Sequence, residues 1–149
     1  MGATGRSLLL VGPRQITFDL GRVGSLLSRP NVQWVGARPF EELLPYLAAM
    51  QVGLVPYTLS EFNRASFPLK TLEYLAAGLP VVSTNLPATR WLDTPLATIA
   101  DDHATFVAAV RAAATIPSSA DERQRFAAEH SWESRAADYL KLVTTASMP

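Results

Sequence analysis

Five short apolar runs recur along the chain, and segments with apolar residues at helical spacing separate them. The runs lie at residues 8–12, 32–36, 52–56, 79–83 and 96–100. The helical patterns lie at about residues 18–27, 40–50, 68–77, 106–114, 121–129 and 132–143. Because short strands and helices alternate, the pattern predicts an α/β fold with a parallel sheet and helices on both of its faces.

The composition describes an ordinary folded domain. The 149 residues are 48% hydrophobic and 17% charged, which is enough apolar material for a core and argues against disorder. Thirteen basic and thirteen acidic residues balance, so no overall field attracts nucleic acid or an anionic membrane. We therefore expect a single domain with no nucleic-acid partner.

The sequence also argues against metal sites and membrane spans. It has no cysteine, so disulfides and thiolate metal sites are excluded, which fits a reducing compartment. His103 and His130 have no partners at metal-ligand spacing, so we expect no metal and no cofactor. No apolar run approaches a bilayer span, and the amino terminus lacks a signal-peptide pattern. We expect a soluble, cytoplasmic protein; peripheral membrane contact by a longer form stays open.

The helix predicted at residues 68–77 carries the strongest candidate chemistry. Pro68 suits a first helical turn, and Gly78 suits the left-handed residue that ends a helix. Lys70 and Glu73 are three residues apart, so they share the polar face near the helix start. A helix amino terminus beside a lysine and a carboxylate can bind a phosphate together with a sugar hydroxyl. The alternative is a surface ion pair.

Cations follow each of the first three predicted strands. Arg14, Arg38 and Arg64 lie in the segments that leave these strands, and Lys70 begins the next helix. Ligands of open parallel sheets bind outside the carboxyl ends of the strands, so these cations predict an anionic ligand there. The alternative is that arginines simply populate loops. The polar segment 57–66 is long for a connection and is predicted to be a functional loop.

The central segment also carries a resemblance. Residues 60–70, running into 72–82, resemble the donor-site signature of group 1 glycosyltransferases of the GT-B fold. The likeness extends to residues 8–12, 31–36, 42–47 and 131–136. The resemblance implies a Rossmann-like parallel sheet that forms the C-terminal, donor-binding half of such an enzyme.

This resemblance implies roles for particular residues. Glu73 would bind the ribose hydroxyls of a nucleotide-diphosphate sugar of the UDP, GDP or ADP type, which a carboxylate can do by accepting two hydrogen bonds. The backbone N–H groups of Leu69 and Lys70 would face the pyrophosphate, and Arg64 would add charge. Gly12 lies in a loop expected near the phosphates, and Arg38 in a region expected near the base.

The departures from the family pattern matter as well. Ala65 stands where the widespread signature has a first glutamate, and Glu61 or Asn63 are candidate substitutes from the same loop. The family's first strand–helix unit and its N-terminal acceptor domain have no counterpart in this sequence. We therefore expect residues 1–149 to be a donor-binding domain, a fragment of a two-domain protein that is inactive alone, and we assign no catalytic residue. The alternative is a non-catalytic Rossmann-like interaction or regulatory module.

Overall fold

The computed structural model describes residues 6–14, 20–67, 69–113, 115 and 119–146. Its elements are β1 (Leu8–Leu10), α1 (Leu20–Leu27), β2 (Val32–Trp34), the 3-10 turn η2 (Phe40–Glu42), α2 (Leu43–Ala49), β3 (Gly53–Val55), α3 (Glu61–Ala65), α4 (Leu69–Ala76), β4 (Val81–Thr84), α5 (Pro87–Trp91), β5 (Ala97–Ala100), α6 (His103–Ala113), α7 (Ala120–Glu129) and α8 (Trp132–Ala146). The predicted alternation of strands and helices is confirmed. The residues outside the described part include Pro68, residues 18–19 at the start of the first predicted helix, residue 114 and residues 116–118.

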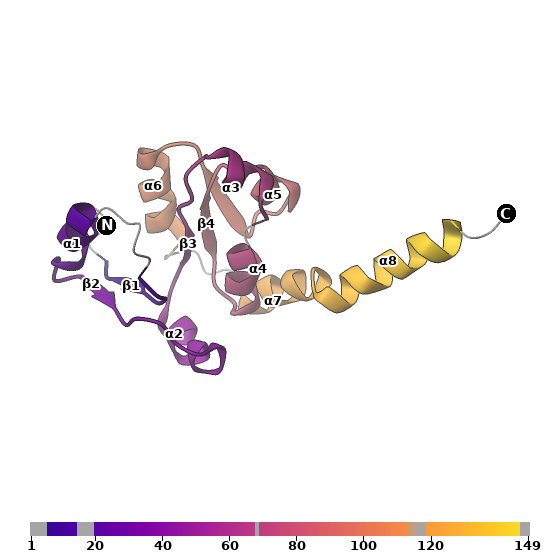
Figure 1. Cartoon of the computed structure of the whole chain (residues 1–149), viewed down its shortest axis with the longest axis horizontal. Coiled ribbons are helices and arrows are strands. Elements are labelled where there is room, and N and C mark those ends of the chain that lie inside the picture. Colours follow the sequence, from indigo (N-terminus) through magenta and orange to yellow (C-terminus); the bar gives the residue numbers. More distant parts are fainter. Residues whose placement is uncertain (1–5, 15–19, 68, 114, 116–118, 147–149) are drawn as a thin grey trace.

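The strands are parallel, as predicted, but they form two sheets where one was expected. β1 pairs with β2, with Leu9 opposite Gln33. β3, β4 and β5 form a three-stranded sheet with β4 in the middle, so that Leu54, Val82 and Thr98 lie side by side. Figure 1 shows the β1–β2 pair with α1 and α2 next to the three-stranded sheet.

The buried core lies on both faces of the three-stranded sheet. On one face, Val55 and Val81 pack with Leu75 of α4 and Ala127 of α7. On the other face, Val82 packs with Val110 and Ala113 of α6. In contrast, no residue that the structure describes before Gly53 is buried. The first sheet and its helices are therefore only partly packed.

Two helices differ from the sequence predictions. The segment 57–66 is not a plain loop, because it contains α3, where the Ser60 hydroxyl caps the helix by accepting the backbone N–H of Asn63 at 3.3 Å. In α4, helical spacing predicts that Leu69 shares an apolar face with Leu72 and Leu75, but Leu69 is 52% exposed. Thr71 is instead fully buried. The core-facing side of α4 is therefore rotated relative to the one predicted.

Helix α8 ends the described chain and extends away from the other elements (Figure 1). It begins where predicted, since the hydroxyl of Ser131 accepts the backbone N–H of Ser134 at 3.2 Å. Its apolar side chains are exposed; they are Trp132, Tyr139, Leu140, Leu142 and Val143. Among the described residues, none of the helices has the length and apolar character needed to cross a membrane.

Candidate functional site

The first turn of α4 places Lys70 and Glu73 together, as their spacing predicted. The Lys70 ammonium donates to the Glu73 carboxylate, and the two side chains are 50% and 43% exposed. An ion pair this exposed contributes about 0.2–1 kcal/mol, so a competing anion can separate the two groups at little cost. The pair is thus available to a ligand that offers a phosphate to the lysine and hydroxyls to the carboxylate.

Lys70, Glu73 and Tyr74 line a cavity of about 810 Å³ that lies between β1 and β3. We refer to it as the β1–β3 cavity. Val11 and Pro56, which follow the carboxyl ends of these two strands, also line it. Burial raises the pKa of the Tyr74 hydroxyl, so this group stays a neutral donor and acceptor at ordinary pH. The cavity therefore reaches the carboxyl ends of β1 and β3, where parallel sheets commonly bind ligands.

Two predicted residues from the first sheet are held by local contacts. The N–H of Gly12 donates to the Gly36 carbonyl at 2.9 Å, and its own carbonyl accepts the Trp34 indole N–H at 2.9 Å. Arg38 donates through Nε to the Tyr46 hydroxyl at 3.0 Å, with its guanidinium 6.0 Å from the ring centre. Neither Gly12 nor Arg38 lines the β1–β3 cavity.

The predicted residues of α3 serve the local fold. Arg64 donates through Nε to the Leu59 carbonyl at 3.1 Å. Asn63 donates through Nδ2 to the Thr58 carbonyl at 2.9 Å. These bonds hold the start of α3 in place. The structure thus groups Leu69, Lys70 and Glu73 on one helical turn, but does not bring Arg64, Asn63, Gly12, Arg38 or the exposed Arg14 into the same cavity.

Two tyrosines at the cavity were not predicted as site residues. Tyr74 packs against the core and also lines the cavity. Tyr46 lies on the side of α2 that carries Leu43, Leu47 and Met50, all of which line the cavity. Tyr46 follows Leu43 by three residues, and this helical spacing is the signal that could have placed it on the face.

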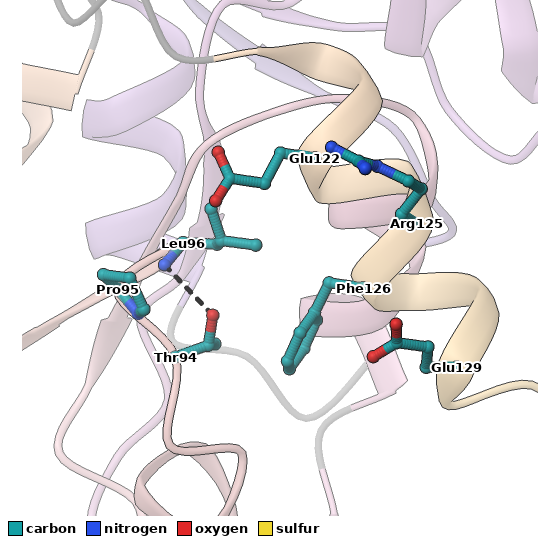
Figure 2. A pocket seen from close by; sticks show the side chains of 7 residues that line it. All are labelled: Thr94, Pro95, Leu96, Glu122, Arg125, Phe126 and Glu129. Atoms are coloured by element: carbon teal, nitrogen blue, oxygen red, sulfur yellow. Dashed lines mark hydrogen bonds between the residues drawn. The ribbon is translucent and has the colours of Figure 1, made fainter.

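A second hollow, of about 250 Å³, lies between α7 and the loop before β5 (Figure 2). Leu96 donates its N–H to the Thr94 hydroxyl at 3.3 Å, and Phe126 turns its ring toward the hollow. Thr94, Pro95 and Leu96 precede β5, so the hollow lies near the amino end of that strand, and neither Lys70 nor Glu73 lines it. Within the part of the chain that the structure describes, no group of three or more histidine and carboxylate side chains could hold a metal ion.

The fold and this site define a Rossmann-like parallel α/β domain with its polar pair on the first turn of α4, at the cavity between β1 and β3. A family model described as glycosyl transferases group 1 matches residues 4–115, and the chain belongs to this family.

The chain is also similar to TuaH of Bacillus subtilis (strain 168), which is named as a proposed glycosyltransferase of teichuronic acid biosynthesis. The two are 43% identical over 89 residues, which are 60% of this chain and 22% of TuaH. The match thus spans less than a quarter of that relative's length. No solved structure gives a significant match.

Proposed function

We propose that this chain is the donor-binding part of a glycosyltransferase that transfers a sugar from a nucleotide-diphosphate sugar to an acceptor hydroxyl. The observation that carries the proposal is the Lys70–Glu73 pair on the first turn of α4, which lines the β1–β3 cavity. Membership of the group 1 family supports it. The acceptor would bind to a second domain of a longer protein.

The two members of the pair have different roles in this proposal. The Glu73 carboxylate accepts hydrogen bonds from the two ribose hydroxyls. The Lys70 ammonium moves from Glu73 to the diphosphate, where the N–H groups of Leu69 and Lys70 at the start of α4 also point. During transfer the diphosphate departs with growing negative charge, and these fixed donors stabilise that charge.

The remaining predicted residues act from farther away in this proposal. Arg64 and Asn63 on α3 directly precede α4 in the chain. Arg64 donates to the Leu59 carbonyl in the free chain. In the complex it donates to a phosphate oxygen instead, and so adds a second cation at the diphosphate. Gly12 lies beside the phosphates of the bound nucleotide, and Arg38 and Tyr46 lie beside its base.

A titration of the isotopically labelled chain, followed by NMR, tests the proposal with UDP, GDP and ADP. We expect weak binding by one of them, with shifts at Lys70 and Glu73. Glu73→Gln should weaken that binding roughly ten- to hundredfold, since hydrogen bonds to charged groups contribute about 1.5–3 kcal/mol. Glu122→Gln makes the same chemical change on α7, away from the α4 pair, and should leave binding unchanged.

The matching 2′-deoxynucleotide separates ribose recognition from general charge effects. It should bind the natural chain more weakly than the ribonucleotide does, and the two should bind Glu73→Gln alike. Equal binding of both nucleotides to the natural chain would contradict the role of Glu73. No binding of any nucleotide, even by a longer form of the protein, would favour the interaction or regulatory module.

A further inference from the structure

Aromatic side chains from distant parts of the chain form a row beside the start of α4. The ring of Phe67 meets the ring of Trp91 edge-on, with the two ring centres 6.1 Å apart. Trp91 meets the His130 ring edge-on at 6.3 Å, and the His130 ring lies 4.4 Å from that of Phe126. Contacts of this kind are favourable between aromatic rings, so the row connects the segment before α4 with α5 and α7.

Trp91 is the residue at which these contacts converge. The Arg135 guanidinium of α8 lies over its ring, 4.9 Å from the ring centre, and adds a cation–π contact. Trp91 is nevertheless 58% exposed, whereas its neighbour Leu92 is 5% exposed. Directed contacts, rather than burial in the core, therefore hold the Trp91 ring.

The short helix α5 gives Trp91 a fixed base. The hydroxyls of Thr89 in α5 and Ser83 in β4 form a hydrogen bond of 3.2 Å, and both residues are buried. Leu86 and Leu92, on either side of α5, are buried in the core. A contact made by Trp91 therefore ties its partner to the three-stranded sheet.

Phe67 is placed to restrain the start of α4. It lies two residues before Leu69, where α4 begins, and two residues span at most about 7 Å. On the inner side of the first turn, the Thr71 hydroxyl is buried and has no hydrogen-bond partner among the described residues, so it does not fix the turn. The orientation of the turn therefore depends on the segment before it, which Trp91 holds through Phe67.

We propose that Trp91 is a positioning residue of the donor site. Its ring supports Phe67, and the supported segment fixes the direction in which the N–H groups of Leu69 and Lys70 point. Trp91 itself does not touch the ligand. This inference rests on the proposed function, which gives these two N–H groups to the diphosphate. Donors that are fixed before binding lose less conformational entropy when the ligand arrives, so the aromatic contact strengthens binding.

Backbone relaxation measured by NMR on the isotopically labelled chain tests the positioning role without a ligand. In Trp91→Leu, the order parameters of the Leu69 and Lys70 amides should fall from about 0.85, typical of rigid backbone, toward roughly 0.6. Trp91→Phe keeps a ring beside Phe67 and should restore them. Trp132→Leu makes the same change at a tryptophan that is 78% exposed, and should leave them unchanged.

Nucleotide binding tests the consequence, with whichever of UDP, GDP and ADP binds the natural chain. Trp91→Leu should weaken binding about two- to tenfold, the factor that corresponds to one aromatic pair. Trp91→Phe should recover most of this loss, and Trp132→Leu should show none. Adding Phe67→Leu to Trp91→Leu should weaken binding no further, because both changes break the same contact.

Three results would overturn the proposal. The first is unchanged order parameters of Leu69 and Lys70 in Trp91→Leu. The second is an equal rise in mobility in α6, which would show general destabilisation. The third is that the losses from Trp91→Leu and Phe67→Leu add, which would mean that Trp91 does not act through Phe67.

The two readouts also separate this proposal from the proposed function. If no nucleotide binds the natural chain, the proposed function fails, while the order parameters still decide whether Trp91 positions the start of α4. Arg135→Met removes the cation over the Trp91 ring and provides the same relaxation test if Trp91→Leu does not fold.

Discussion

At the scale of single residues, Gly53 has no room for a side chain. A Cβ at this position would lie 2.3 Å from Cγ of Tyr74, which packs against the core. We expect Gly53→Ala to displace the Tyr74 ring and to lower the free energy of unfolding by about 1–3 kcal/mol, as overpacking commonly does. Denaturant unfolding of the purified chain measures the change.

Gly24→Ala is the matched control for this substitution. A Cβ at Gly24 meets no atom within 4 Å, and the residue lies inside α1. Alanine favours a helix interior over glycine by about 0.5–1 kcal/mol, so the control should be neutral or stabilising. Equal losses for both variants would show that the Tyr74 contact is not the cause.

Asp102 gives a prediction that depends on pH. Its carboxylate accepts the backbone N–H of Thr105 at 2.8 Å at the start of α6, and hydrogen bonds from Thr105 lower the pKa of the Asp102 carboxyl. Because the pKa of Asp102 is lower in the folded chain than in the unfolded chain, its carboxylate stabilises the folded chain at pH values above the unfolded-state pKa. This stabilisation is lost as the pH falls through the folded-state pKa.

Asp102→Asn keeps a capping side chain but removes the charge. The natural chain should therefore have the higher thermal midpoint at neutral pH, and its advantage should shrink below about pH 4. Thermal unfolding of both chains across acidic pH checks this. A difference that stays constant with pH would contradict the assigned cause.

Among the candidate site residues, the sequence predicted which two share a helical turn, but not which partners the loop residues contact. Lys70 and Glu73 meet because their spacing alone determines that they share a helical turn. The partners of Arg38 and Arg64 depend instead on loop geometry. Arg38 donates to the Tyr46 hydroxyl, and Arg64 donates to the Leu59 carbonyl. Local periodicity carries no information about such partners.

At the scale of elements, α7 holds α4 in place through a buried charge. Arg123 of α7 is only 6% exposed, and its Nε donates to the Gly78 carbonyl at 2.7 Å, just beyond the end of α4. We expect Arg123→Met to lower the free energy of unfolding by about 1–3 kcal/mol, because the Gly78 carbonyl loses its charged donor. Arg125→Met, at an exposed position of the same helix, should change it by less than about 0.5 kcal/mol.

The order and type of the main elements followed from the sequence, because apolar spacing and turn residues are local signals. The helix α3 was missed because its five residues carry no apolar period, and its start depends on the Ser60 cap. In the helix predicted at residues 40–50, apolar spacing places Phe40 and Leu44 on the core-facing side, but these two are 79% and 71% exposed. Apolar residues without a packing partner look the same in sequence as those with one.

At the scale of the whole molecule, the division into two sheets was not predictable. The apolar run at residues 8–12 predicts a buried strand, but β1 is only half-buried in the structure. Whether a strand joins a given sheet depends on long-range pairing, which no short pattern records.

Because α8 extends away from the other elements, we expect its removal to have little effect on the stability of the remaining chain. A chain that ends at Ser131 loses α8 but none of the buried residues around the three-stranded sheet. Its helical circular dichroism should fall, while its thermal midpoint should stay within a few degrees, since a change of about 1 kcal/mol shifts the midpoint by only a few degrees. Loss of a cooperative transition would show that α8 contributes to the core.

The distribution of burial along the chain also bears on how the protein emerges from the ribosome. Residues before Gly53 are synthesised first, yet the described buried core is built from residues between Gly53 and Ala127. At roughly 5–20 residues per second, the intervening chain takes on the order of 4–15 s to appear. The leucines of β1 therefore lack a folded core beside them for a time set by the rate of translation rather than by the rate of folding.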